Sequence, residues 1–174
     1  MANRTDSTAI SVHGTNPQFL IEKIVRLKIH SCNYWKEKCY ALTGIIYLWI
    51  IYLILLAETL VDRAVELEYV GGTYGGSRKP APFLCLVLKM LQLQPEAEIV
   101  YEFVKNKDYK YPFLKKFLMS YRYVTALGCF YLRLVGRSED IYSYLEPLYN
   151  DYRKLRLRET DGSTVLKCLS ILLN

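Results

Sequence analysis

Glycine spacing in the segment GGTYGG, residues 71–76, is the first feature that could do chemistry. Gly71 and Gly76 have the spacing of the glycines in a GxxxxGK[ST] loop, whose backbone amides surround a phosphate that the lysine also reaches. Ser77 stands where that loop requires lysine, and no strand is predicted before the segment. We therefore expect these glycines to form a tight helix–helix connection with positive φ and to bind nothing.

Histidine and cysteine side chains could bind a metal or form a nucleophilic site. His30, Cys32 and Cys39 lie close in sequence, but structural zinc sites use CxxC-type pairs and four ligands, which this spacing does not give. The five cysteines have no repeated spacing and residues 1–18 contain no apolar signal segment, so we expect reduced thiols. GxSxG, HExxH and Cys–His patterns are absent from the sequence. The sequence predicts a protein that is not an enzyme and needs no metal or other cofactor.

Cations stand beside aromatic residues in two stretches. In residues 149–158 two tyrosines are accompanied by four cations, and in residues 105–122 lysine is interleaved with tyrosine and phenylalanine. Such mixtures can bind the RNA backbone and stack on its bases. They are also typical of ordinary helix surfaces, where long cationic side chains cover apolar neighbours. A basic RNA-binding module, including contact with spliceosomal RNA, therefore remains one alternative.

An uncharged apolar stretch raises the question of a membrane. Residues 39–57 lie between Lys38 and Glu58 without a single charge, and about 20 apolar residues are needed to cross a bilayer as a helix. Lysines before the stretch and acids after it would place the N-terminus in the cytoplasm. A buried helix or a segment foreign to the domain explains the stretch equally well, and the rest of the chain favours these explanations. A single-pass membrane protein is the other alternative.

The overall composition is that of a folded domain. The chain has 174 residues, a net charge of +6 and 52% hydrophobic residues, which excludes disorder over most of its length. Glycine and proline together number 15, which excludes a collagen or linker protein. The length fits one domain with a sizeable core.

Apolar spacing along the chain predicts helices nearly throughout. Asn16-Pro17 has the pattern of a helix start, after which Phe19, Ile24 and Leu27 follow helical spacing. The run after Pro82 is apolar on nearly all sides, which is typical of a core helix. Alternation typical of strands is scarce, so we expect an all-α fold in a single compact multi-helix domain. Further expected helices cover 58–68, begin at Pro95 and Ser138, and continue after Pro147 as a basic helix over 148–158.

Seven segments resemble the pre-mRNA-splicing factor 38 family, in its branch with a short helical N-terminal domain. The resemblance implies a nuclear, non-enzymatic, all-helical scaffold of the spliceosome that is needed for spliceosome activation. It also implies binding to other splicing proteins, including a zinc-finger factor and a microfibrillar-associated-protein-like factor. The segments are HGTNPQFLIEKI (13–24), YWKEKCYALT (34–43), ETLVDRAVELEYVGGTYGG (58–76), PFLCLVLKMLQLQPE (82–96), EIVYEFVKN (98–106), GCFYLRL (128–134) and YLEPLYNDYRK (144–154).

The sequence departs from the family pattern in three places. Residues 44–56 and 112–123 are insertions, and the resemblance fades after about Arg158. Both insertions are rich in residues with A/T-rich codons, and we interpret them as translated introns or gene-model errors. We therefore expect a flexible N-terminal tail, a helical splicing-factor domain with two interruptions, and a divergent C-terminal segment. Their ranges are 1–12, 13–158 and 159–174.

Protein-binding residues are expected on the YLEPLYNDYRK segment, which combines aromatic rings with charges. The alternative for Tyr144 and Tyr149 is that they only pack against the helical core. The membrane is an improbable partner if the chain is a splicing scaffold. The candidate contact residues are Tyr144, Glu146, Tyr149, Asp151, Tyr152 and Arg153.

The first insertion generates a prediction about solubility. Deleting Gly44–Leu56 should raise the soluble yield, because these residues add apolar surface that a soluble monomer rarely exposes. The measurement compares soluble protein from the full chain and the deletion under identical expression. Equal yields would count against the interpretation.

Overall fold

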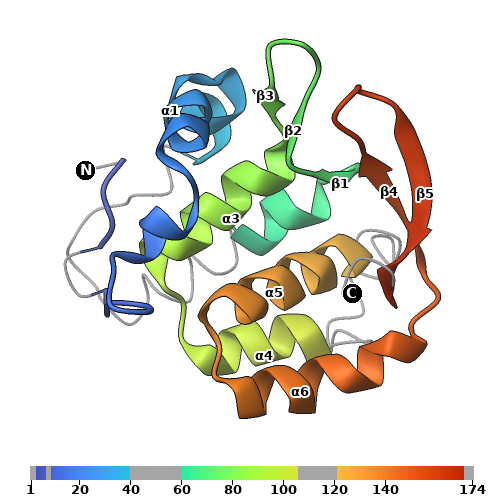
Figure 1. Ribbon diagram of the computed structural model, residues 1–174. Helices are drawn as coiled ribbons and strands as arrows, with labels where there is room; N and C mark the ends of the chain where they lie inside the picture. Colours follow the sequence, from blue (N-terminus) through green and yellow to red (C-terminus); the bar gives the residue numbers. More distant parts are fainter. Residues whose placement is uncertain (1–2, 7–8, 40–59, 106–120, 171–174) are drawn as a thin grey trace.

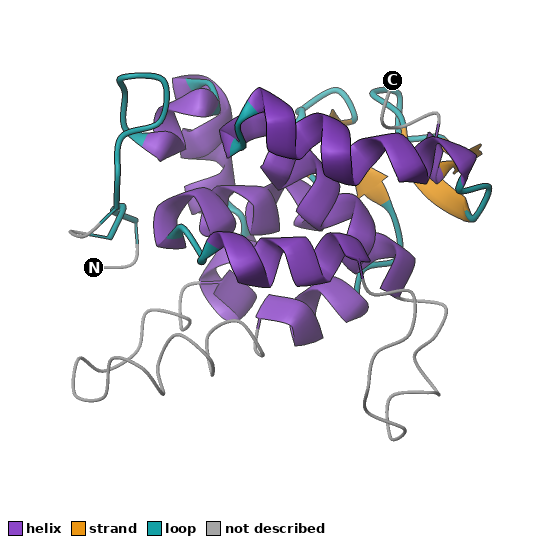
Figure 2. Ribbon diagram, turned by 90° about the horizontal axis from the view of Figure 1, so that it is seen from below, coloured by secondary structure: helices purple, strands orange, loops and turns teal. Residues whose placement is uncertain are grey.

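The computed structural model describes residues 3–6, 9–39, 60–105 and 121–170 (Figure 1). Helix α3 (Pro82–Leu93) lies at the centre, with α1 (Lys23–Ser31) on one side. On the other side lie α5 (Tyr121–Val135), α4 (Ala97–Lys105) and α6 (Ser138–Leu145). The strands gather along one side of this helical body (Figure 2).

The central helix α3 is buried on nearly every face, as the sequence predicts. Pro82 occupies its first turn, where a missing N–H costs nothing, and Gln94 ends it in a left-handed conformation with φ of 45°. Nine of its twelve residues are buried. These are Phe83, Cys85, Leu86, Val87, Leu88, Lys89, Met90, Leu91 and Gln92.

The first helical segment forms where predicted but buries a different face. The Asn16 side chain accepts a hydrogen bond from the amide of Gln18 and caps a short 3-10 helix, Pro17–Leu20. The chain is extended at Ile21 before α1 begins, so helical spacing does not continue across the break. Ile24 and Leu27, expected to line an inward stripe, are consequently 62% and 59% exposed.

The N-terminal segment contacts the core helix through hydrogen bonds. The amide of Asp6 donates to the Gln92 carbonyl at 2.9 Å. The Gln94 side chain bonds both the amide and the carbonyl of Ile10, at 2.6 and 2.8 Å. The indole of Trp35, in the π-helix Trp35–Cys39, donates to the Asn3 side chain at 3.0 Å.

Strands correct the prediction of an all-α fold to a mostly helical one. β1 (Val70–Gly71) pairs in parallel with β4 (Lys154–Arg158), which pairs antiparallel with β5 (Thr164–Cys168). A hairpin joins β2 (Thr73–Tyr74) and β3 (Lys79–Pro80).

The predicted basic helix over 148–158 is wrong. A 3-10 helix, Glu146–Asn150, is followed by extended chain and then β4. In KLRLR the residues alternate, with Leu155 buried between exposed Lys154 and Arg156, which is the period of a strand.

The glycine segment 71–76 contains the end of β1, strand β2 and the start of the turn between β2 and β3, where a helix–helix connection was expected. Gly75 has a φ of +72°, as predicted for a glycine-dependent connection. A Cβ at Gly71 would lie 3.0 Å from the Arg158 carbonyl oxygen, so the glycine allows β1 to approach β4.

The insertions and the apolar stretch fall largely outside the described residues. Residues 44–56 lie wholly outside, as do residues 40–57 of the candidate membrane span. Of 112–123, the last three residues are described and begin α5, where the Tyr123 hydroxyl donates to the Glu68 carbonyl at 2.7 Å. Within the described ranges, no helix is long and apolar enough to cross a membrane.

Lys89 is a fully buried cation in α3. Its ammonium lies 5.6 Å from the centroid of the Trp35 ring, and it has no hydrogen-bond partner among the described residues. Burial lowers the pKa of Lys89 to about 8. The charged form therefore destabilises the folded state at neutral pH.

Replacing this cation should stabilise the fold. We expect Lys89→Met to raise the free energy of unfolding at pH 7 by about 1–3 kcal/mol. As pH rises above 8, the folded wild-type chain loses the Lys89 proton while the unfolded chain keeps it, so the difference between the proteins should shrink. Urea unfolding at pH 7 and pH 9.5 measures both effects, with exposed Lys36→Met as the control. An equal difference at both pH values would contradict this account.

Helices α4 and α5 pack closely at Gly128. A Cβ there would lie 2.8 Å from the Cβ of Phe103 and 3.3 Å from a methyl group of Val104. Phe103 and Val104 are buried on the inner face of α4. The absence of a side chain at Gly128 therefore sets the distance between the two helices.

Filling this contact should destabilise the domain. Gly128→Ala should lower the free energy of unfolding by about 1–2 kcal/mol, even though alanine favours a helix over glycine. Gly76→Ala is the matched control, because nothing lies within 4 Å of the added Cβ there. Thermal unfolding monitored by circular dichroism compares the variants. A Gly128→Ala protein as stable as the control would show that the helices can separate without cost.

Candidate protein-interaction surface

Tyr144 lies in the last turn of α6 and packs against α4. Its ring stacks on Tyr101 with centroids 4.2 Å apart and planes at 14°. The ammonium of Lys105 lies 4.8 Å from the centroid of the same ring. Tyr144 is half-buried, so one of its roles is to attach α6 to α4.

Beyond Tyr144 the chain turns outward. Pro147 lies in the first turn of the 3-10 helix, where the only buried residue is Leu148. Glu146 and Tyr149 are exposed, and Tyr152 is 73% exposed. Two tyrosine rings and a carboxylate are thus presented together to solvent.

Asp151 and Arg153 form an ion pair that fixes the chain after the 3-10 helix. The Arg153 guanidinium donates to both Asp151 carboxylate oxygens, from Nη2 to Oδ2 at 2.6 Å and from Nε to Oδ1 at 3.0 Å. The amides of Leu169 and Ser170 donate to the carbonyls of Arg153 and Asp151, which joins this stretch to the end of β5. Because the Asp151 side chain is almost fully buried, the main role of this ion pair is to hold the local structure, and Asp151 has little surface left for a partner protein.

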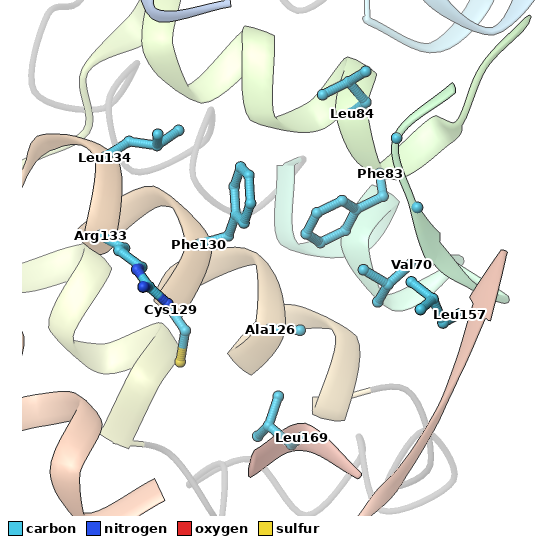
Figure 3. A pocket seen from close by; sticks show the side chains of 12 residues that line it. Val70, Phe83, Leu84, Ala126, Cys129, Phe130, Arg133, Leu134, Leu157 and Leu169 are labelled. Atoms are coloured by element: carbon cyan, nitrogen blue, oxygen red, sulfur yellow. The ribbon is translucent and has the colours of Figure 1, made fainter. Parts of the chain in front are cut away.

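An apolar cavity of about 540 Å³ lies between α3, α5 and the sheet (Figure 3). The ring of Phe130 stands edge-on to Phe83 with centroids 5.8 Å apart, and Phe130 remains partly exposed. The carbon-rich wall suits an apolar side chain of a partner. Its main apolar lining residues are Val70, Phe83, Phe130, Leu134, Leu157 and Leu169.

No pattern in the sequence predicted this cavity. Its walls come from three separated stretches, around Val70–Leu84, 126–134 and 157–169. Phe130 is exposed on a helix that is otherwise largely buried, which the structure alone shows. The pairing of β1 with β4 brings the third stretch beside the first.

Helix α1 presents a second apolar surface. Ile24 and Leu27 point away from the buried Ile29, and the Arg26 guanidinium lies 4.5 Å from the centroid of the exposed Phe19 ring. No acidic residue occurs within Lys23–Ser31. The helix therefore combines exposed aliphatic side chains with positive charge.

Several cations proposed for RNA contact are engaged within the protein. The Arg158 guanidinium lies 4.9 and 4.1 Å from the ring centroids of Tyr69 and Tyr74. Arg122 donates to the Lys154 carbonyl at 2.6 Å. Lys154 and Arg156 point outward from β4, and residues 106–120 lie outside the described ranges.

No metal centre is formed by the described part of the chain. There, no cluster of three or more His, Cys, Asp or Glu side chains could hold an ion. His30 packs on the Trp35 ring at 5.2 Å, and its pKa is lowered by burial and by Arg26. Cys32 instead lies beside Cys85, with sulfurs 3.8 Å apart.

Comparison with protein families confirms the resemblance seen in the sequence. Residues 10–172 match the model of the PRP38 family, so the match continues past Arg158 and includes β5. Pre-mRNA-splicing factor 38 of Arabidopsis thaliana is 57% identical over 162 residues, which are 93% of this chain and 39% of the relative. Pre-mRNA-splicing factor 38A of Mus musculus is 51% identical over 166 residues, 95% of this chain and 45% of the relative. The chain thus spans less than half the length of these relatives.

A solved structure shares this fold. It is the Snu23–Prp38–MFAP1(217–258) complex of Chaetomium thermophilum, with a TM-score of 0.72 and 35% sequence identity. The similarity covers 95% of this chain and 73% of that one.

Proposed function

This chain belongs to the PRP38 family, and we propose that it acts as a non-enzymatic scaffold of the spliceosome during pre-mRNA splicing. Its task is to hold other splicing proteins through protein–protein contacts, in the nucleus. The buried core of the helical body and the exposed apolar and aromatic groups on it support this role.

The observation that carries the proposal is the complex formed by the Chaetomium relative. That protein is solved together with Snu23 and residues 217–258 of MFAP1. At 35% identity, this chain shares its fold with 73% of that relative, which supports the same kind of partner binding here. We therefore assign two partners to this chain, a zinc-finger factor like Snu23 and an MFAP1-like factor.

Two features supply the contact surface of this proposal. The apolar cavity beside Phe130 can take an anchor side chain, and such buried anchors contribute most of the affinity of an interface. The segment 144–153 presents Tyr149 and Tyr152, and tyrosine is enriched at interfaces because it combines a large ring with a polar tip. The candidate residues with free side-chain surface are Glu146, Tyr149 and Tyr152, with Tyr144, Asp151 and Arg153 holding them in place.

Binding to the MFAP1 segment tests the proposal. The full chain should bind a synthetic peptide of Chaetomium MFAP1 residues 217–258, measured by calorimetry. Phe130→Ser and Tyr152→Ala should each weaken binding about tenfold if they contribute as interface residues of ordinary strength. Tyr142→Ala is a matched control, because Tyr142 is 72% exposed and lies outside the proposed surface.

The possible outcomes test the scaffold role and the proposed contact surface separately. No binding of the wild-type chain to the peptide or to Chaetomium Snu23 would overturn the scaffold role. Binding that both variants leave unchanged would retain the role and reject the surface. Circular dichroism of each variant shows whether it is folded.

A further inference from the structure

Two cysteines from distant parts of the sequence meet beside the core helix. Cys32 ends α1, and Cys85 lies in the first turn of α3, 53 residues later. Their sulfur atoms are 3.8 Å apart, whereas sulfurs in a disulfide are about 2.0 Å apart. Helices α1 and α3 contact each other, and the two sulfurs already touch, so rotations of the two side chains can bring them closer.

The two thiols have different environments. Cys32 is partly exposed, and its sulfur also accepts a hydrogen bond from the Trp35 amide at 3.4 Å. The hydrogen bond with the Cys85 thiol, followed by that amide, lowers the pKa of Cys32 to about 6. Cys85 is fully buried. Cys32 is therefore suited to react first as a thiolate, with Cys85 as the thiol that resolves the product.

We propose that Cys32 and Cys85 form a peroxide-oxidisable dithiol pair. The Cys32 thiolate attacks one peroxide oxygen, the O–O bond breaks, and Cys32 becomes a sulfenic acid while the other oxygen leaves as water or alcohol after taking a proton. The Cys85 sulfur then attacks the Cys32 sulfur, the S–O bond breaks, and the Cys85 proton leaves with the hydroxyl as water. The two thiols lose two electrons and the peroxide gains them.

The disulfide would join α1 directly to α3. It would close a loop of more than fifty residues, and cross-links across long loops restrict the unfolded chain strongly. It would also fix the position of Trp35, which follows Cys32 closely and packs over Lys89. Oxidation should therefore raise the melting temperature by several degrees, and reduction should reverse the change.

The remaining cysteines differ from this pair. Burial raises the pKa of Cys39 and of Cys129 to about 12, which keeps both as unreactive thiols. Cys168 is partly exposed but lies in β5, within the sheet. Cys168→Ser is consequently a control that removes a partly exposed thiol without touching the pair.

Mass spectrometry of the oxidised chain tests the proposal. The full chain, freed of reductant, is treated with one equivalent of hydrogen peroxide and digested without reduction. We expect a Cys32–Cys85 disulfide as the main product in the wild-type chain and in Cys168→Ser. Cys85→Ala removes the hydrogen bond that lowers the pKa of Cys32, so Cys32 should oxidise more slowly and stop at a sulfenic acid that dimedone traps. In Cys32→Ser neither the disulfide nor the thermal shift should form.

Three results would overturn the proposal. They are a main disulfide that joins other cysteines, oxidation of Cys32 to sulfinic acid without a cross-link, and a cross-link that forms only in urea. Cys32→Ser changes a partly exposed position, so it keeps the test informative if Cys85→Ala does not fold. None of these results depends on partner binding, so the scaffold role is tested separately.

Discussion

The burial of α3 on almost every face is the constraint on which the rest of the structure depends. An apolar helix of this kind cannot face water, so it has to be covered on all sides by other elements. Helix α1, the π-helix Trp35–Cys39 and the 3-10 helix Pro17–Leu20 contact α3, as do α5 and β1. The positions of the cavity, of the cysteine pair and of Lys89 all follow from what lies against this helix.

Features set by neighbouring residues were predictable from the sequence. The cap at Asn16 and the burial of α3 on nearly every face depend on local spacing and on the chemistry of single residues. The inward face of α1 was not predictable, because the extended residue Ile21 separates two helices that read as one. The strand β4 was missed because a short alternating run of Leu with Lys and Arg fits either structure until a partner strand is known.

In the candidate surface, too, some features depend on neighbouring residues and others on distant ones. The exposure of Tyr149 and Tyr152 agrees with the polar character of their segment, whereas the buried pairing of Asp151 with Arg153 depends on the return of β5. The cavity requires three stretches to come together, so no local pattern could indicate it. Sequence similarity supplied the family, and the structure supplied the groups that can meet a partner.

The parallel pairing of Val70 with Leu157 has a consequence for how the chain is made. During synthesis the first half of the protein leaves the ribosome long before β4 does. Until then, β1 and part of the core lack the residues that bury them in the folded chain. Contacts between such distant residues slow folding and leave apolar surface open to association in the meantime. Synthesis of this protein therefore includes an interval in which a chaperone that binds nascent chains has a natural substrate.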